Sequence, residues 1–338
     1  KLSPKLFIQT DLSFYHPGDV VTGSVYAHLP SPLLTETLWL QIVGYEHCSR
    51  MSSIGGQSRS SGRHDYFNYK VPLSHWPNKL VEEGDYSFPF VFPLPSNLPG
   101  SLTMKQQGIQ AEISYKLLAS FQGLDISDEF FILVLQPNVE ALKPDFQTLT
   151  RPVRYASCFN RGHVSMSVRF MDRHLELGQP AKCLIEIDNK HSDCEITFIT
   201  CSLWRKLSLM SNKGEKYEVR DLMGLGRLPG VPRRGSITSS KDLELKPSAH
   251  EVVEKQLSST EGQMINCSYY LEIAAYFQSW ICMHTPPLIV MTQVNLGPKH
   301  PQKREVPELP EIWSPRIMPV ANLGNSSRSL LSLSFTDN

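Results

Sequence analysis

Cysteine is scarce in this chain, and long apolar runs are missing altogether. The 338 residues include seven cysteines, an odd number that cannot pair completely within one chain. The longest uninterrupted apolar run, Phe130–Leu135, is far shorter than the ~20 residues that a membrane-spanning helix requires. No apolar secretory segment precedes the first strand that we expect. These absences predict a protein without a transmembrane segment in a reducing cytoplasm.

An excess of charge of either sign is also missing. Lysine and arginine together number 33, and aspartate and glutamate together also number 33, so the formal net charge is zero. A neutral chain has no overall field that would hold a polyanion or an anionic membrane surface. We therefore expect no nucleic-acid partner.

Room for long helices is limited, because 25 prolines and 20 glycines interrupt the chain. What remains alternates between apolar and polar residues with a period of two. In Val20–Leu29, for example, Val21 and Val25 share one face, and Thr37–Tyr45 and Ala111–Phe121 show the same alternation. Such segments predict an all-β fold in which antiparallel sheets pack as sandwiches.

One short turn is specified by its residues. In "HPGD", Pro17 presets φ at the second turn position, and Gly18 tolerates the positive φ that the third position of a type II turn requires. The turn ends at Asp19 and leads into the next strand. Gly23 lies inside that strand, where a glycine indicates either a bulge or the close approach of another backbone.

The design of this turn and strand recurs later in the chain. "LELGQPAKCLIEIDN" repeats the pattern of "YHPGDVVTGSVYAHL", with Gly178 in the place of Gly18. A second pair of similar segments contains Tyr115 and Tyr269, at nearly the same separation. Two strands that recur in order at nearly constant spacing predict that one sandwich was duplicated.

The expected domain organisation follows from this repeat, because 338 residues are too many for one ordinary core. We predict an N-terminal sandwich over 1–140, an interdomain linker over 141–155, a C-terminal sandwich over 156–298 and a Pro/Ser-rich, partly mobile tail over 299–338.

Free sheet edges and long loops are the expected recognition surfaces. Polar composition predicts loops over His47–Asp65 and Ser208–Pro247, which are either binding loops or disordered segments without a ligand. In the second loop, Arg233 and Arg234 precede Ser236 as in the sites of basophilic kinases. We predict regulatory phosphorylation of Ser236; the alternatives are an unmodified surface serine, or arginines that receive a partner's phosphate.

Residue types that could bind a metal ion or a phosphate are present, but they lack the spacing that such sites need. Cys183, His191, Cys194 and Cys201 lie close in sequence but lack the paired Cys-x-x-Cys motifs that indicate zinc. Free buried cysteines are therefore expected. The segment Gly224–Gly230 has neither the glycine spacing nor the βαβ context of a phosphate-binding loop. We predict no catalytic site, no cofactor and no metal ion.

The motifs of this chain, in the order in which they occur, resemble those of the arrestin family, and within it the arrestin domain-containing proteins or α-arrestins. The N-terminal half contains a Tyr-x-Pro-Gly-Asp turn with a Val-x-Gly-x-Val strand, at Tyr15–Val25, and the proline-bearing aromatic segment Tyr86–Leu102. The C-terminal half contains "CFNRGHVSMSVRF" from Cys158, a strand that ends at Asn189, and "PPLIVMTQV" from Pro286. The motif residues with a structural role are Pro17, Gly18, Asp19, Gly23, Gly178 and Asn189.

This resemblance implies two tandem immunoglobulin-like β-sandwiches with a short linker. It also implies a non-enzymatic cytoplasmic adaptor at endosomal or plasma-membrane surfaces. Such an adaptor binds cytoplasmic tails of membrane proteins and links them to endocytic, endosomal or signalling machinery. The Pro-Pro-x-Tyr motif through which many α-arrestins bind ubiquitin ligases does not occur in this sequence, so that route is not expected.

Three alternatives stay open from the sequence. The first is a retromer-like cargo-sorting subunit, and the second is a scaffold subunit held permanently in a larger cytoskeletal or ciliary assembly. The third is a secreted immunoglobulin-like protein, which would need disulfides between its sheets. Arg169 either belongs to a buried charged cluster of the arrestin type or faces outward. The cargo and the oligomeric state stay open.

Overall fold

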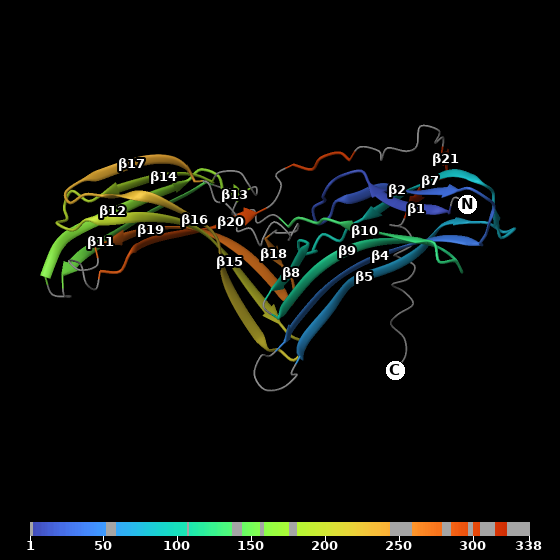
Figure 1. Cartoon of the computed structure of the whole chain (residues 1–338), viewed down its shortest axis with the longest axis horizontal. Coiled ribbons are helices and arrows are strands. Elements are labelled where there is room, and N and C mark those ends of the chain that lie inside the picture. Colours follow the sequence, from blue (N-terminus) through green and yellow to red (C-terminus); the bar gives the residue numbers. More distant parts are fainter. Residues whose placement is uncertain are drawn as a thin grey trace.

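The computed structural model describes residues 3–51, 59–106, 108–136, 144–155, 159–175, 181–243, 259–278, 285–296, 300–304 and 315–322. Every regular element in these residues is a β-strand, so the all-β prediction is confirmed. The strands form two sandwiches of facing sheets along the long axis of the molecule (Figure 1). No helix in this part of the chain has the length and apolar character that crossing a membrane requires.

The N-terminal sandwich has two main sheets. The first has the order β1 (Lys5–Thr10), β2 (Val20–Leu29), β7 (Gly84–Pro93) and β21 (Arg316–Ile317), and β22 (Ala321–Asn322) also pairs with β7. The second has the order β10 (Ser127–Ile132), β9 (Ile109–Phe121), β4 (Thr37–Met51) and β5 (Arg59–His75), and β8 (Leu102–Gln106) pairs with β9. The short strands β3 (Leu33–Leu34) and β6 (Leu80–Val81) pair separately.

The C-terminal sandwich is built in the same way. One sheet has the order β11 (Asp145–Tyr155), β12 (Phe159–Phe170), β14 (Ala181–Asp188) and β17 (Ser236–Leu243). The other has the order β13 (His174–Leu175), β20 (Leu288–Leu296), β19 (Ile265–Phe277), β15 (Ile196–Met210) and β16 (Lys216–Val231), and β18 (Thr260–Glu261) pairs with β19.

The two sandwiches repeat one topology. β2 lies between β1 and β7, as β14 lies between β12 and β17, and β9 lies between β10 and β4, as β19 lies between β20 and β15. The strands that the sequence pairs as repeats therefore occupy equivalent places in their sheets. In this correspondence β17 is the counterpart of β7.

Alternation along the strands explains the core. In β2, every second residue from Val21 to Leu29 is buried, while the residues that alternate with them, Thr22 to His28, are only half-buried. Along β14, Cys183, Ile185 and Ile187 are buried in the same way. The buried apolar side chains of both sandwiches form one contiguous cluster. The junction between the sandwiches is therefore packed, and apolar burial helps to hold it together.

The prediction of two long loops is wrong over most of their length. β4 continues to Met51 and β5 begins at Arg59, so only residues 52–58, which lie outside the described residues, separate the two strands. β15, β16 and β17 likewise fill most of 208–243. Ser, Arg and Gly dominate these segments because much of each strand faces solvent, and composition alone did not distinguish such a strand from a loop.

The predicted linker over 141–155 also differs from the structure, because Asp145–Tyr155 forms β11, an edge strand of the C-terminal sandwich. The register of β11 against β12 shifts between Pro152 and Arg154. A proline at a bulge on an edge strand costs little, since no neighbouring strand needs its missing N–H. Because β11 contains polar residues and this proline, its sequence resembles that of an interdomain linker.

Two parts of the predicted mobile tail are ordered against the N-terminal sandwich. Leu12 forms a β-bridge with Lys303, and the N–H of Arg304 donates to the carbonyl oxygen of Asp11 at 2.8 Å. Farther along, β21 and β22 pair in parallel with β7. The chain thus leaves the C-terminal sandwich and returns to the first sheet of the N-terminal one (Figure 1).

Candidate functional site: sheet edges, the junction and the turn before β17

The edge of β7 holds a segment from the far end of the chain. Arg316 pairs with Tyr86 and Ile317 pairs with Ser87 in a parallel ladder. The N–H of Met318 also donates to the carbonyl oxygen of Ser87 at 2.9 Å. Backbone groups of β7 that would otherwise form an open edge therefore bind extended chain.

Side chains on one face of this segment help to hold it, because Met318 and Ala321 pack against the apolar core. Ile317 is 78% exposed and Val320 is 61% exposed. The guanidinium of Arg316 pairs with Glu82 at 3.1 Å, but both side chains are largely exposed, and such pairs contribute only about 0–1 kcal/mol. Main-chain hydrogen bonds, together with the packing of Met318 and Ala321, thus attach the segment to β7.

Long hairpins from the two sandwiches meet at the junction (Figure 1). The N–H of Asn212, at the β15–β16 turn, donates to the carbonyl oxygen of Ser61 in β5 at 3.4 Å. The hydroxyl of Thr260 donates to the carbonyl oxygen of Gly100 at 2.9 Å. These contacts join residues that are far apart in sequence, and they tie β5 and the segment before β8 to the C-terminal sandwich.

Glu46 lies at the centre of this junction and is completely buried. One carboxylate oxygen accepts the N–H of Met264, from the C-terminal sandwich, at 2.9 Å. The other oxygen lies beside Gly262 and has no partner within the described residues that meets hydrogen-bond geometry. Burial raises the pKa of the Glu46 carboxyl, although the Met264 N–H, the Tyr66 hydroxyl and His64 favour the charged form.

This burial predicts a pH dependence of stability. Because folding raises the pKa of Glu46, the folded state binds the proton more tightly, and the free energy of unfolding falls as pH rises from the ordinary glutamate pKa through the raised value. Glu46→Gln removes this penalty, so we expect the variant to be more stable than wild type at neutral pH and to lose that advantage in acid. Urea unfolding across pH measures the effect, with the exposed Glu83→Gln as control; parallel profiles for Glu46→Gln and wild type would contradict it.

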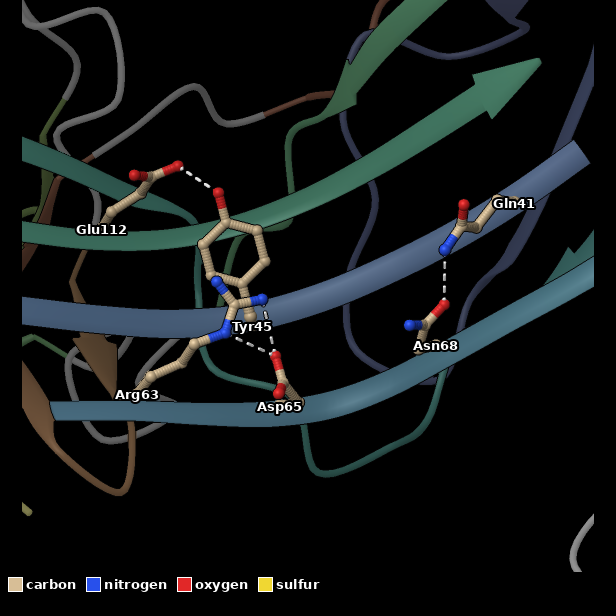
Figure 2. A network of polar contacts seen from close by, with 6 residues as sticks. All are labelled: Gln41, Tyr45, Arg63, Asp65, Asn68 and Glu112. Atoms are coloured by element: carbon tan, nitrogen blue, oxygen red, sulfur yellow. Dashed lines mark hydrogen bonds and ion pairs between the residues drawn. The ribbon is translucent and has the colours of Figure 1, made fainter. Parts of the chain in front are cut away.

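A polar network covers the outer face of the second N-terminal sheet near the junction (Figure 2). The hydroxyl of Tyr45 donates to Glu112 at 2.7 Å, and the guanidinium carbon of Arg63 lies 4.3 Å from the centre of the Tyr45 ring. Arg63 is itself paired with Asp65 at 2.9 Å. A cavity of about 310 Å³ adjoins these side chains and also contacts Asn212. The Arg63 charge is already balanced by Asp65, so the network lacks the unpaired cation that would select an anionic ligand.

The predicted type II turn is present. Gly18 has φ of 87°, and the N–H of Asp19 donates to the carbonyl oxygen of His16 at 3.0 Å. The carboxylate of Asp19 accepts the N–H of His16 at 2.7 Å, and its carbonyl oxygen accepts the N–H of Leu94 at 2.9 Å. Pro17, Gly18 and Asp19 thus lie in a turn that is tied to the segment after β7.

Gly23 marks a close approach rather than a bulge. The register of β2 against β1 and β7 runs through Gly23 without a shift. A Cβ at this position would overlap the carbonyl oxygen of Gln9 and would lie 2.8 Å from the ring of Phe90. Only glycine leaves room for the Phe90 side chain here.

Asn189 is fully buried and joins two turns of the C-terminal sandwich. Its side-chain amide donates to the carbonyl oxygens of Cys194 at 2.8 Å and Pro232 at 2.9 Å. Its backbone N–H donates to the carbonyl oxygen of Gly235 at 2.9 Å. Asn189 therefore holds the β14–β15 turn against the β16–β17 turn, while Gly178 lies outside the described residues.

Ser236 is exposed and begins β17, directly after a tight turn. The N–H of Gly235 donates to the carbonyl oxygen of Pro232 at 3.1 Å, and Arg234 has φ of 56°. The Arg234 guanidinium pairs with Asp193 at 2.9 Å. Arg233 is exposed and has no ion-pair partner within the described residues. The basic residues and Ser236 thus come together at the surface, in a turn instead of a long loop.

The cysteines differ in part from expectation. Cys183 and Cys201 are free and buried, as predicted, and burial raises the pKa of the Cys183 thiol to about 12. Cys194 is disulfide-bonded, so the prediction of a free cysteine is wrong there. Sequence spacing gave no sign of this bond, because pairing depends on the approach of distant segments. Across the described ranges, no group of three or more His, Cys, Asp or Glu side chains is arranged to hold a metal ion.

Arg169 faces outward. It is exposed on β12, and its guanidinium carbon lies 5.5 Å from the centre of the Phe146 ring. The outward-facing interpretation of this arginine is therefore the correct one.

Comparison with known proteins supports the resemblance. Residues 6–136 match the family model described as arrestin (or S-antigen), N-terminal domain. "Arrestin domain-containing protein A" of Dictyostelium discoideum is 24% identical over 128 residues, which are 34% of this chain and 22% of that protein. The match thus spans about a fifth of the length of this relative. The residues matched by the family model cover the N-terminal sandwich from β1 to β10, and both matches support membership of the arrestin family.

Proposed function

We propose that this protein is a non-enzymatic adaptor that binds extended segments of other proteins by adding them as strands to its sheet edges. The single observation that carries this proposal is the edge of β7, which pairs in parallel with residues 316–322. Because that attachment includes backbone hydrogen bonds, which any extended chain can form, the same edge chemistry is available to other chains. Arrestin-family membership favours an adaptor over an enzyme.

The proposed partners are the cytoplasmic tails of membrane proteins, which the adaptor would link to endocytic, endosomal or signalling machinery in the cytoplasm. Such tails are extended and suit strand addition. Membership of the arrestin family supports this role. The alternatives are a retromer-like cargo-sorting subunit and a scaffold subunit held permanently in a cytoskeletal or ciliary assembly.

The two sandwiches are proposed to be separate domains that divide between Gln136 and Pro144. Apart from β21 and β22, each main sheet takes its strands from only one side of this division. Residues 300–322 then act with the N-terminal domain, against which their described parts lie.

Proximity labelling in the native cell tests the adaptor role. The intact chain and a version that lacks 299–338 are each expected to label membrane proteins and trafficking components. Removal of the tail opens the β7 edge and should change which partners are labelled. A labelled set confined to one stable cytoskeletal or ciliary assembly, unchanged by the deletion, would support the scaffold alternative and contradict the adaptor.

Phosphorylation of Ser236 is proposed as a regulatory event. Exposure of Ser236, Arg233 and Arg234 on one turn supports it, since basophilic kinases read arginines that precede the target serine. A basophilic kinase incubated with the folded chain is expected to add one phosphate that Ser236→Ala abolishes and Thr238→Ala does not. Labelling that persists in Ser236→Ala would assign the site elsewhere.

A further inference from the structure

Most sheet edges of this protein are closed or protected within the described residues. On β1, the N–H of Ile8 donates to the Asp128 carboxylate of β10 at 2.8 Å, so the edges of β1 and β10 meet each other. β7 is covered by β21 and β22, and β13 is only two residues long. Natural sheets use such coverings and short edge strands to prevent unwanted pairing.

The remaining long edges carry other protective features. Register shifts interrupt β5 against β4, β11 against β12 and β16 against β15. Each of these three edge strands also contains a proline, at Pro72, Pro152 and Pro229. Bulges and prolines twist an edge or remove its donors, so an added strand pairs poorly there.

β17 differs from all of these edges. Its eight residues pair with β14 in one unbroken register from Ser236 to Leu243. The sequence "SITSSKDL" contains no proline, and its first five residues carry no charge. Within the described residues, no strand pairs with its outer side. A regular and unprotected edge is the kind to which another chain adds.

The internal repeat adds a second argument. β17 occupies in the C-terminal sandwich the place that β7 occupies in the N-terminal one. The β7 edge binds extended chain in parallel, and Glu82, just before β7, pairs with Arg316 at the start of the added strand. Just before β17 lies a charge of the opposite sign: Arg233 is exposed and without an ionic partner in the described part of the chain.

The side chains around the β17 edge indicate which residue types an added strand would need. Ile237 is half-buried and packs against the core, so the inward side chain beside it would be apolar. Arg234 is already paired with Asp193, which leaves Arg233 as the cation at the start of the edge. The carboxylates of Glu186 and Asp188 lie one strand farther in, on β14, where distance from an added strand and salt weaken their effect.

We propose that the open edge of β17 binds an extended partner segment in parallel, with an acidic residue at the start of that segment facing Arg233 and apolar residues at alternate positions. This site rests on the proposed adaptor function and gives it a second binding edge with its own charge preference. Phosphate on Ser236 would add negative charge beside Arg233 and weaken the binding of such an acidic segment.

The test uses the full chain and a fluorescein-labelled octapeptide of alternating valine and threonine with aspartate at its second position. In fluorescence anisotropy, Arg233→Glu is expected to lower the affinity of the protein for the aspartate peptide about tenfold. The same variant is expected to raise the affinity for a matched peptide with lysine in place of aspartate. Arg227→Glu, a charge reversal on a different strand, is the control. An equal response of both peptides to Arg233→Glu would contradict the charge assignment.

Two proline variants test the edge itself. N–H groups of neighbouring strand residues point to opposite sides, so Thr238→Pro and Ser239→Pro differ in which side loses a donor. The variant that removes an N–H facing β14 is expected to unfold at lower temperature, because it breaks pairing with β14. The variant that removes an N–H on the outer edge is expected to stay stable and to lose peptide binding at least tenfold. If both variants fold and still bind the peptide, the β17 site is wrong. That result does not contradict the adaptor function, which proximity labelling tests separately. A dimer in sedimentation that the stable proline variant abolishes would also overturn this assignment, because the edge would then serve a second copy.

Discussion

Replacement of Asn189 with alanine is expected to lower the free energy of unfolding by about 3 kcal/mol. The side-chain amide donates to two carbonyl oxygens, of Cys194 and Pro232, and the residue is fully buried. Alanine removes the amide donor from the buried Cys194 carbonyl and from the Pro232 carbonyl, which keeps the Gly235 N–H. A buried polar group that loses a partner costs about 1–3 kcal/mol, and each further hydrogen bond contributes about 1 kcal/mol. Urea unfolding monitored by tryptophan fluorescence measures the loss.

A second variant separates hydrogen bonding from packing at this position. Asn189→Asp keeps the shape but sets a carboxylate against two carbonyl oxygens, so we expect it to be less stable than Asn189→Ala at neutral pH. It should recover partly in acid, where a protonated carboxyl again donates one hydrogen bond. Asn68→Ala, which removes an exposed amide partner of Gln41, is the control and should change stability by under about 0.5 kcal/mol. Equal losses at positions 68 and 189 would refute the role of the buried amide.

Replacement of Gly23 with alanine is expected to cost about 3 kcal/mol. The new methyl group would overlap the Gln9 carbonyl oxygen and press on the Phe90 ring, and neither the β1 backbone nor a buried aromatic side chain moves aside easily. Overpacking of this kind typically costs 1–3 kcal/mol, and here the obstacle is partly backbone. Thermal and urea unfolding of the full chain both report it.

The matched control for Gly23 is Gly226→Ala. Gly226 also lies inside a strand, but a Cβ there would find its nearest neighbours at ordinary contact distance, 3.7 Å or more. We expect a change within about 0.5 kcal/mol, since alanine also loses less chain entropy than glycine on folding. If both variants lose equal stability, the cost is a general one of strand glycines and not the close approach at Gly23.

The strands and the first turn were predictable because they depend on neighbours along the chain. Alternation in β2 placed Val21 and Val25 inward, and the structure confirms both. Pro17 and Gly18 specified a type II turn whose φ and hydrogen bond are as expected. The repeat of that strand design also matches the equivalent positions of β2 and β14.

The long hairpins, β11 and the tail strands could not be recognised in the same way. Polar residues on a strand that faces solvent have the composition of a loop, and Pro152 in β11 is acceptable only because β11 lies at an edge. β21 and β22 are two residues each, too short for a periodic pattern. Their strand structure comes from the backbone of β7, which lies more than 200 positions earlier in the chain.

Some residues of the candidate site could be recognised from local sequence, and others could not. Ser236 with its arginines, and Asn189 at the end of its strand, carry local sequence signals. Glu46 continues the inward-facing positions of Leu40 and Ile42 in β4, but a glutamate at such a position gives no sign of the partner that its carboxylate contacts. Its burial against Met264 depends on the packing of one sandwich on the other.

The amino-acid sequence by itself determined that this protein is all-β, that it repeats one sandwich design, and where its tight turn and conformationally demanding glycine lie. Those features follow from side-chain periodicity and from the φ preferences of proline and glycine, which act over a few residues. Only the tertiary structure decided which sheet edges are paired and which are unpaired among the described residues, and which carboxylate is buried at the junction. Strand pairing and the partners of buried polar groups are contacts between distant residues, and the local sequence pattern does not specify them.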